Sequence, residues 1–235
     1  MGLLWEGLVD ALRLLARGDP ATLRIAGLSL AVSGLATALA ALVGLPLGAA
    51  LALGRFPGRG LLTGLVNTGM GLPPVVVGLG VSLLLWRSGP LGALALLYTP
   101  AAMVLAQFVV AMPLAAGLTR AALDLVAGDL VGALRVDGAP EWRVGWELLR
   151  AVRAQVLVAV AAAFGRAIAE VGASLMVGGN IVGQTRILTT AIALETGRGE
   201  FARAIALGLI LLALAFLVNV GLLRGARAAA GLGLP

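Results

Sequence analysis

The 235-residue sequence is strongly apolar: hydrophobic residues make up 60% of it, charged residues 12%, and the formal net charge is +6. With a mean hydropathy of +1.06, this composition is typical of integral membrane proteins. The lack of Cys and His excludes disulfides, the usual zinc sites and thiol or imidazole catalysis, and the lack of Lys excludes a P-loop ATPase. The arginines are spread over short loops rather than gathered with aromatic residues, so we expect no nucleic-acid partner.

The beginning of the chain predicts a helix that lies along the membrane interface. Four leucines share one helical face and four charged residues share the other: Leu4, Leu8, Leu12 and Leu15, against Glu6, Asp10, Arg13 and Arg17. The apolar run that follows is about 30 residues long, too long for the core of a cleavable signal. We expect an amphipathic interfacial helix over residues 1–20 and one transmembrane domain over residues 21–235.

Five apolar stretches are long enough to cross a bilayer, because about 20 residues of helix span its hydrocarbon layer. They are Ile25–Gly54, Gly60–Trp86, Ser88–Thr119, Ala154 to about Gly178, and Ala204–Leu223. An odd number of spans places the two termini on opposite faces of the membrane. The cytoplasmic loops carry slightly more arginine if the N-terminus lies outside, so the positive-inside rule favours an external N-terminus and a cytoplasmic C-terminus. The sequence therefore predicts an all-α integral membrane protein.

The longest polar interruption, residues 121–153, carries charges of both signs, which is typical of an exposed helical segment. Within it, the run GALRVDGAPEWRVGWELLRA at 132–151 predicts two short helices joined by a turn. Gly138 can take the left-handed conformation that ends a helix, and Pro140 suits the first turn of the next one. The same pattern also fits a plain two-helix hairpin with no binding role.

The fourth apolar stretch carries Arg166 and Glu170 among small and apolar residues. A charge at the centre of a bilayer costs roughly 2.5–3.5 kcal/mol on insertion scales, so an intramembrane charge marks a candidate functional site. The two residues are four apart, which places them on one helical face where each neutralises the other. Gly172 and its small neighbours let a second helix approach closely. The pair either lines or gates a pathway, or it is a static ion pair that locks helix packing.

The run GGNIVGQTRILTTAIALETGRGEF at 178–201 loses apolar continuity and collects polar side chains. Asn180, Gln184, Thr185 and Arg186 lie among glycines that allow the chain to bend. This composition fits a loop that partly re-enters the membrane, where backbone donors, hydroxyls and an arginine meet an anion. A polar connecting loop is the alternative.

The 132–151 run resembles the signature loop of ABC-importer permeases, which reads Glu-Ala-Ala, three residues, Gly, nine residues, then Ile-x-Leu-Pro. Gly132, Ala133 and Leu134 stand at the first three places and Gly138 at the glycine, whereas the Glu and the closing Leu-Pro are missing. The run AFGRAIAEVGASLMVGGNIVGQTRILTTAIALETGRGEFARAIALGLILL at 163–212 looks like that of tungstate-importer permeases and, less closely, of molybdate permeases. This similarity extends over nearly the whole chain.

The resemblance implies a type I ABC-importer transmembrane domain, with about five spans and an N-terminal interfacial helix, of which two copies pack around a central pathway. It implies three kinds of partner besides membrane lipid: ABC ATPase subunits, a periplasmic or lipid-anchored substrate-binding protein, and a second copy of the chain. No residue performs covalent chemistry, and the chain holds no metal or cofactor, because ATP and Mg are bound by the ATPase. The implied ATPase-docking residues are Ala133, Leu134, Asp137, Gly138, Ala139, Pro140 and Glu141. The implied pathway or gate residues are Arg166, Glu170, Gly172, Asn180, Gln184 and Thr185.

The function that follows from the resemblance is import of an oxyanion by alternating access, with tungstate or molybdate as the expected substrate and sulfate or another small solute as the alternative. A secondary transporter or channel would show repeated halves or a selectivity ring. A membrane scaffold would give no reason for the 132–151 pattern. Discrimination among oxyanions is expected to reside mainly in the binding protein.

Overall fold

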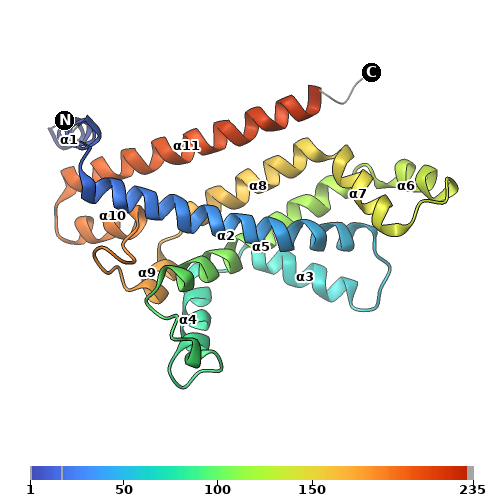
Figure 1. The fold of residues 1–235 in the computed structure, drawn as a ribbon, viewed down its shortest axis with the longest axis horizontal. Helices are drawn as coiled ribbons and strands as arrows, with labels where there is room; N and C mark the ends of the chain where they lie inside the picture. Colours follow the sequence, from blue (N-terminus) through green and yellow to red (C-terminus); the bar gives the residue numbers. More distant parts are fainter. Residues whose placement is uncertain (1, 17, 232–235) are drawn as a thin grey trace. The chain divides into compact units, whose positions relative to one another are not determined.

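The computed structural model describes residues 2–16 and 18–231, and this part of the chain consists of helices and connecting turns (Figure 1). The helices are α1 (Gly2–Ala16), α2 (Pro20–Leu53), α3 (Arg59–Met70), α4 (Pro74–Leu85), the 3₁₀ helix η1 (Gly92–Leu94), α5 (Pro100–Asp124), α6 (Ala127–Val136), α7 (Glu141–Ala151), α8 (Arg153–Ile168), α9 (Gly172–Gly178), α10 (Leu188–Gly197) and α11 (Phe201–Gly231). The prediction of an all-α protein is confirmed.

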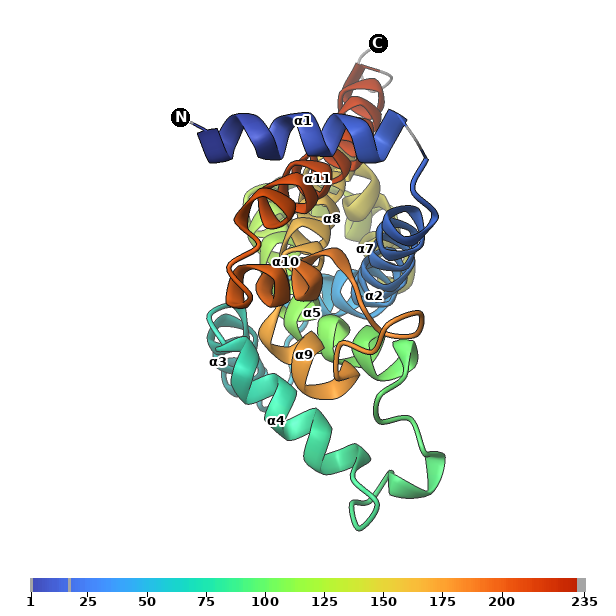
Figure 2. The same ribbon diagram turned by 90° about the vertical axis from the view of Figure 1, so that its left-hand side faces the viewer.

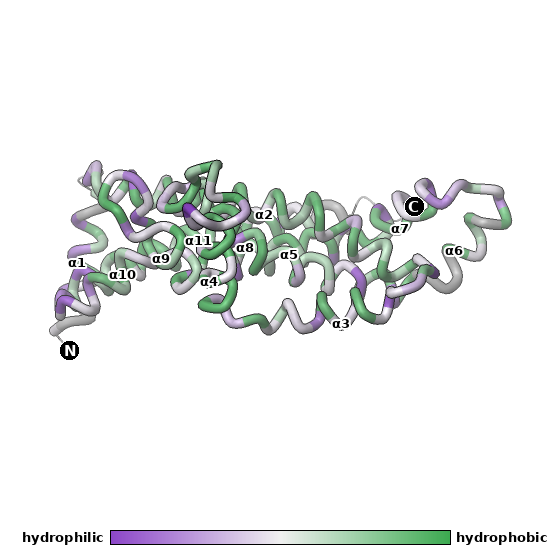
Figure 3. The backbone as a smooth tube through the Cα atoms, turned by 90° about the horizontal axis from the view of Figure 1, so that it is seen from below, coloured by the Kyte–Doolittle hydropathy of each residue, from purple (hydrophilic) through white to green (hydrophobic). Residues whose placement is uncertain are grey.

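Within the described residues, three helices are long and apolar enough to cross a membrane singly: α2, α5 and the Phe201–Ala226 part of α11. Two bent pairs, α3 with α4 and α7 with α8, bring the number to five if each pair is one span. Figure 3 shows long hydrophobic runs along α2 and α5, whereas hydrophilic stretches occur in α1 and around α6 and α7. The expectation of about five spans is met, but two of them are not continuous helices.

The second predicted span, Gly60–Trp86, is interrupted between α3 and α4. Gly71 closes α3, and Pro73 and Pro74 follow at the start of α4. Proline has no backbone N–H and restricts the residue before it to extended conformations, so a helix cannot run through this site. The span predicted at Gly60–Trp86 is therefore not one continuous helix, although the two prolines in the sequence signalled the break.

The third predicted span begins later than Ser88, because α5 starts at Pro100. Thr99 caps this start, since its Oγ1 accepts a hydrogen bond from the N–H of Ala102 at 3.4 Å. The segment before it, residues 86–99, is a connection that contains only the short helix η1. Apolar side chains in this connection had made it look like part of a span.

The fourth predicted span is also broken, because α8 ends at Ile168 and α9 begins at Gly172. Glu170 lies in the break, and its Oε1 accepts a hydrogen bond from the N–H of Ala173 at 2.8 Å. A side-chain acceptor thus replaces the helical carbonyl partner at the start of α9. Arg166 and Glu170 are consequently paired across a helix end rather than along one continuous helix.

The chain forms two compact units, each built from three separate segments. The first comprises residues 1–36, 73–108 and 166–218, and the second comprises 37–72, 109–165 and 219–235. One core of the first unit gathers Ala26, Leu188, Ala191, Leu207 and Ile210. Each of the long helices α2, α5 and α11 is divided between the two units. A single domain over residues 21–235 stays a prediction, and residues 232–235 lie outside the described part.

Helix α1 contacts the beginning of α11, across which it lies in Figure 2. Gly7 lies directly against α11, because a Cβ atom there would clash with the side chain of Ile205. Ala11, one turn later, is buried, whereas Leu8 and Leu12 are exposed. The small residues of α1 thus face α11 and leave these leucines uncovered, as an interfacial helix requires. The side chains of Leu4 and Leu15, and residue 17, lie outside the described part.

Candidate functional site

The connection between α6 and α7, residues 137–140, is a sharp helix end followed directly by a helix start. Gly138 has φ +74°, and the N–H of Ala139 donates to the carbonyl of Leu134 at 3.0 Å. When the residue after a left-handed glycine donates its N–H to a carbonyl in the last turn of the helix, the ending is called a Schellman motif. This motif satisfies the last carbonyls of the helix. Pro140 caps α7 in an extended conformation. The predicted roles of Gly138 and Pro140 in chain reversal are confirmed, with Pro140 one position before the helix.

One face of this α6–α7 elbow, which we define as residues 127–151, packs onto its own compact unit. Val144 and Leu148 of α7 are fully buried, together with Leu123 at the end of α5. Leu134 and Ala139 pack against the same core from the edge. Two of the seven predicted docking residues therefore hold the elbow in place rather than lying on its outer surface.

The other face of the elbow is exposed. It carries the remaining predicted docking residues, Ala133, Asp137, Gly138, Pro140 and Glu141. It also carries large apolar side chains that the sequence reasoning missed: Val136, Trp142 and Trp146, which are 89%, 74% and 62% exposed. The sequence contained a signal for this surface. The two tryptophans are four positions apart and lie on a different face of α7 from the buried Val144 and Leu148, which are also four apart. A mixed apolar and charged surface of this kind is suited to a protein partner.

A second group of predicted residues meets at the junction of α8 and α9. Glu170 is 1% exposed, and its Oε2 lies 3.6 Å from Nη1 of Arg166, which is 31% exposed. Its other carboxylate oxygen holds the N–H of Ala173, and its backbone carbonyl accepts the hydroxyl of Thr189 at 2.9 Å. Glu170 therefore connects the end of α8, the start of α9 and the first turn of α10. The predicted ion pair is present.

Helix α9 is fixed between α4 and α5 by close contacts. A Cβ at Gly78 would lie 2.8 Å from the Cα of Ala173, and one at Gly172 would lie 3.1 Å from Cγ2 of Val75. On the α5 side, Nε2 of the fully buried Gln107 donates to Oγ of Ser174 at 3.1 Å. The sequence reasoning missed Gln107, since its partner is 67 positions away. Gly172, predicted as a pathway residue, serves here in close helix packing.

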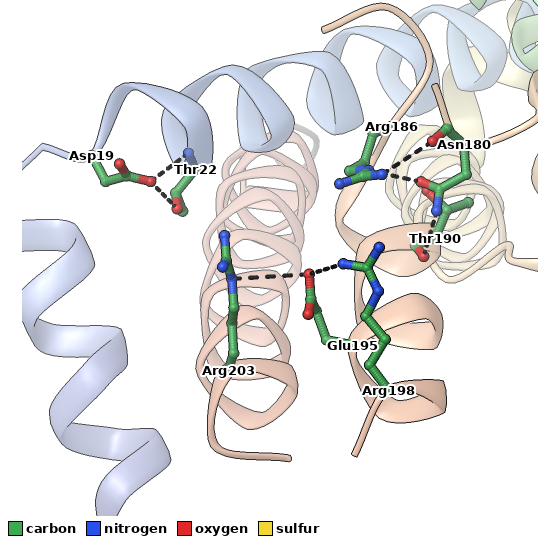
Figure 4. A network of polar contacts seen from close by, with 8 residues as sticks. All are labelled: Asp19, Thr22, Asn180, Arg186, Thr190, Glu195, Arg198 and Arg203. Atoms are coloured by element: carbon green, nitrogen blue, oxygen red, sulfur yellow. Dashed lines mark hydrogen bonds and ion pairs between the residues drawn. The ribbon is translucent and has the colours of Figure 1, made fainter. Parts of the chain in front are cut away.

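The loop between α9 and α10, residues 179–187, is held by its own polar groups. The hydroxyl of the buried Thr185 donates to the carbonyl of Gly178 and accepts the N–H of Ile181, the latter at 2.9 Å. Asn180 has φ +53° and accepts two hydrogen bonds from the guanidinium of Arg186 (Figure 4). Gln184 is exposed. Thr185 and Asn180 thus maintain the loop, whereas Gln184 lies on its surface.

A separate ionic network, which the sequence reasoning missed, surrounds the end of α10. Figure 4 shows Arg198 and Arg203 directed at the nearly buried Glu195, to which they lie at 3.9 and 4.0 Å. Nearby, Asp19 caps α2 by accepting the hydroxyl and the N–H of Thr22 at 2.6 and 2.9 Å. These hydrogen bonds, with a smaller contribution from the charge of Arg203, lower the pKa of Asp19.

The predicted residues fall into two groups, one in each compact unit. The docking residues lie in the second unit, and the six pathway residues lie in the first. Helix α10 joins the pathway group, because Thr189 binds Glu170 and the carbonyl of Thr190 accepts Nδ2 of Asn180 at 3.4 Å. Within the described residues, no three acidic side chains are placed to hold a metal ion.

Comparison with known proteins gives the class of protein. Residues 44–223 match the family described as "Binding-protein-dependent transport system inner membrane component". Because the match covers most of the chain, the protein belongs to this family. It is therefore a multi-pass inner-membrane transport component and not an enzyme, as the sequence predicted.

Two relatives sharpen the comparison. The chain is 45% identical over 200 residues to the "Probable anion ABC transporter permease protein" of Haloferax volcanii, covering 83% of this chain and 86% of that protein. It is 41% identical over 214 residues to the "Tungstate uptake system permease protein TupB" of Peptoclostridium acidaminophilum, covering 91% and 94%. A chain of the inward-facing MetNI methionine ABC transporter has a similar fold, with a TM-score of 0.73 at 21% identity, covering 90% of this chain and 97% of that chain.

Proposed function

We propose that the protein is the membrane-spanning permease subunit of an ATP-driven importer for an oxyanion, with tungstate as the first candidate substrate and molybdate as the second. The observation that carries this proposal is similarity over nearly the full length to permeases named for anion and tungstate transport. Both candidate substrates are divalent tetrahedral anions. The chain itself needs no ATP, metal or other cofactor, because nucleotide and Mg are bound by a separate ATPase.

The α6–α7 elbow is the proposed docking site for that ATPase. Its inner face is anchored through Val144 and Leu148, and its outer face offers acidic and aromatic side chains around Gly138. An elbow anchored on one side transmits a push better than a loose loop, because force applied to the exposed face moves the helices beneath it. In this arrangement the elbow is cytoplasmic, the N-terminus lies outside and the C-terminus lies inside.

The transport cycle proposed for this subunit is alternating access by two copies of the chain. ATP-driven closing of the ATPases brings the two elbows together and opens the pathway outward, toward a substrate-binding protein, and hydrolysis resets it. The α8–α10 segment is the proposed gate or lining. Glu170 supports this assignment because one residue there fixes three helices, so a change in its contacts would release all of them together.

Reconstitution tests the substrate. The permease is assembled in proteoliposomes with its ATPase and binding protein, and uptake of tungstate, molybdate and sulfate is measured with ATP enclosed. We expect ATP-dependent uptake of tungstate or molybdate well above that of sulfate. Uptake of sulfate alone would make sulfate, and not tungstate or molybdate, the substrate. Uptake without ATP would indicate a secondary transporter or channel.

Cysteine cross-linking tests the docking site and benefits from a chain that has no native cysteine. Asp137→Cys and Trp142→Cys, both on the exposed face, are combined with single cysteines on the ATPase. We expect cross-links from both positions, changing in yield when ATP is bound. Glu200→Cys, exposed in the turn before α11, is the matched control and should form none. Equal yields at all three positions would contradict docking at the elbow.

A further inference from the structure

The segment from the last turn of α8 to the first turn of α11 carries four arginines, and their partners differ. Arg166 lies within 4.0 Å of Glu170, and Arg198 and Arg203 lie within that distance of Glu195. Arg186 has no carboxylate at ion-pair distance within the described part of the chain. No carboxylate among the described residues therefore pairs with its positive charge.

Arg186 is half-buried and held by neutral oxygens alone (Figure 4). Its Nε donates to Oδ1 of Asn180 at 3.2 Å, and its Nη2 donates to the carbonyl of the same residue at 3.4 Å. Both distances are longer than the roughly 2.7–2.9 Å of a hydrogen bond between a charged donor and a charged acceptor. Asn180 thus orients the guanidinium without satisfying its charge.

Besides Arg186, the polar side chains of the 179–187 loop that are not exposed, Thr185 and Asn180, are already engaged. Thr185 uses its hydroxyl both as donor and as acceptor inside the loop, and the N–H of Ile181 is bound to it. Asn180 donates its amide to the carbonyl of Thr190. Arg186 is therefore the charged donor of this loop. A doubly negative oxyanion would attract its guanidinium more strongly than the neutral oxygens of Asn180 do, because opposite charges add a direct Coulombic attraction.

We propose that Arg186 directly contacts the translocated oxyanion during its passage through the permease. This inference rests on the proposed function. The planar guanidinium presents paired donors that match two oxygens of a tetrahedral anion. Asn180 keeps this fork in a fixed direction, so little side-chain freedom is lost when the anion binds. A role confined to holding Asn180 in its left-handed conformation is the competing explanation.

The complete complex, reconstituted with ATPase and binding protein, separates these explanations when tungstate uptake and ATP hydrolysis are both measured. Arg186→Gln should lower the uptake per ATP by about tenfold or more, the effect of losing one hydrogen bond to a charged group. Asn180→Gly keeps the positive-φ backbone and removes only the side chain that orients the guanidinium, so its uptake should fall much less than that of Arg186→Gln. Arg198→Gln, which removes a paired and exposed arginine, should leave uptake unchanged.

Wild-type uptake by the Arg186→Gln variant would overturn the inference, and so would equal losses in Arg186→Gln and Asn180→Gly. Should Arg186→Gln not assemble, Arg186→Cys is labelled after assembly with a cationic or an anionic thiosulfonate reagent. A trimethylammonium label cannot hydrogen-bond to Asn180, so higher uptake with the cationic label supports contact with the anion, and equal uptake with both labels rejects it. A wild-type complex that carries no oxyanion would overturn the proposed function itself.

Discussion

The α6–α7 elbow and the α8–α10 segment use polar residues in opposite ways. In the elbow, Asp137, Trp142 and Trp146 are exposed, and apolar side chains such as Leu148 pack beneath them and hold the structure. In the α8–α10 segment, Glu170, Ser174 and Thr189 are buried, and hydrogen bonds between distant parts of the chain, one of them from Gln107 of α5, hold the structure. The first region exposes its polar and aromatic groups, as the proposed docking site requires, and the second uses its polar groups to fix the positions of its own helices.

This difference has an energetic consequence. Exposed charges contribute little to folding, with a median of about 0–1 kcal/mol per ion pair, whereas removing one partner of a buried pair leaves a charge without compensation. Substitutions on the outer face of the elbow should therefore change activity and leave stability nearly unchanged. Substitutions at Glu170 should change stability first.

Glu170→Ala should give the largest effect. It removes the counter-charge of Arg166 and the acceptor for the N–H of Ala173, so we expect a loss of about 3–5 kcal/mol in stability. The measurement is thermal unfolding of the purified complex in detergent. Glu200→Ala, an exposed acidic residue, is the control and should be close to wild type. If both variants unfold at the same temperature, the buried carboxylate does not hold the junction.

The exchange of the two charges, Arg166→Glu with Glu170→Arg, extends this experiment. It restores an ion pair, but arginine at position 170 has no acceptor for the N–H of Ala173. The exchanged protein should therefore remain destabilised. Normal stability and transport in the exchanged protein would show that the charge pair alone matters and would exclude a gating or lining role for these residues.

Leu148→Ala should destabilise the elbow by about 2–5 kcal/mol, because it opens a cavity in a fully buried site. Trp142→Ala removes a side chain that is 74% exposed on the same helix and should change stability by only about 0.5 kcal/mol. For ATPase activity coupled to transport we expect the reverse order. In properly folded protein, Trp142→Ala should lose more of this activity than Leu148→Ala. If wild type and Trp142→Ala have equal ATPase activity coupled to transport, the exposed face of the elbow is not the docking site.

Gly138→Glu should abolish ATPase activity coupled to transport while membrane insertion continues. Its φ of +74° costs a residue with a Cβ about 1–2 kcal/mol, and the added charge projects from an open site. Gly132→Glu adds the same charge on α6, where φ is not positive and the site is equally open. The control should therefore retain coupling. Loss of coupling in both variants would assign the effect to charge rather than to the turn at Gly138.

The sequence predicted those features that depend on neighbouring residues. The turn at Gly138 and the pairing of Arg166 with Glu170 follow from spacings of a few positions. The interruption at Pro73 and Pro74 was also readable, but long apolar runs concealed it. Gln107 with Ser174, and Thr189 with Glu170, were not predictable, because these pairs form only when α5, α9 and α10 pack together.

Asp19→Ala should give the smallest effect, and its pH dependence is the informative part. Hydrogen bonds from Thr22 lower the pKa of Asp19 in the folded protein below its ordinary value of 3.8. The carboxylate therefore stabilises the fold at pH values above that ordinary value, and this contribution disappears as the pH falls through the lowered pKa. Asp19→Ala should unfold at a slightly lower temperature than wild type at neutral pH, with the difference vanishing in strong acid.

Asp19→Asn is the matched control for the capping interaction, because asparagine also caps helices well but does not titrate. Its stability should lie between that of wild type and Asp19→Ala at neutral pH, and it should not lose its capping contribution in acid. A deficit in Asp19→Ala that stays constant from neutral pH to strong acid would show that the charge of Asp19 contributes nothing. The start of α2 would then be held by neutral contacts alone, unlike the α8–α9 junction, where a carboxylate supplies the cap.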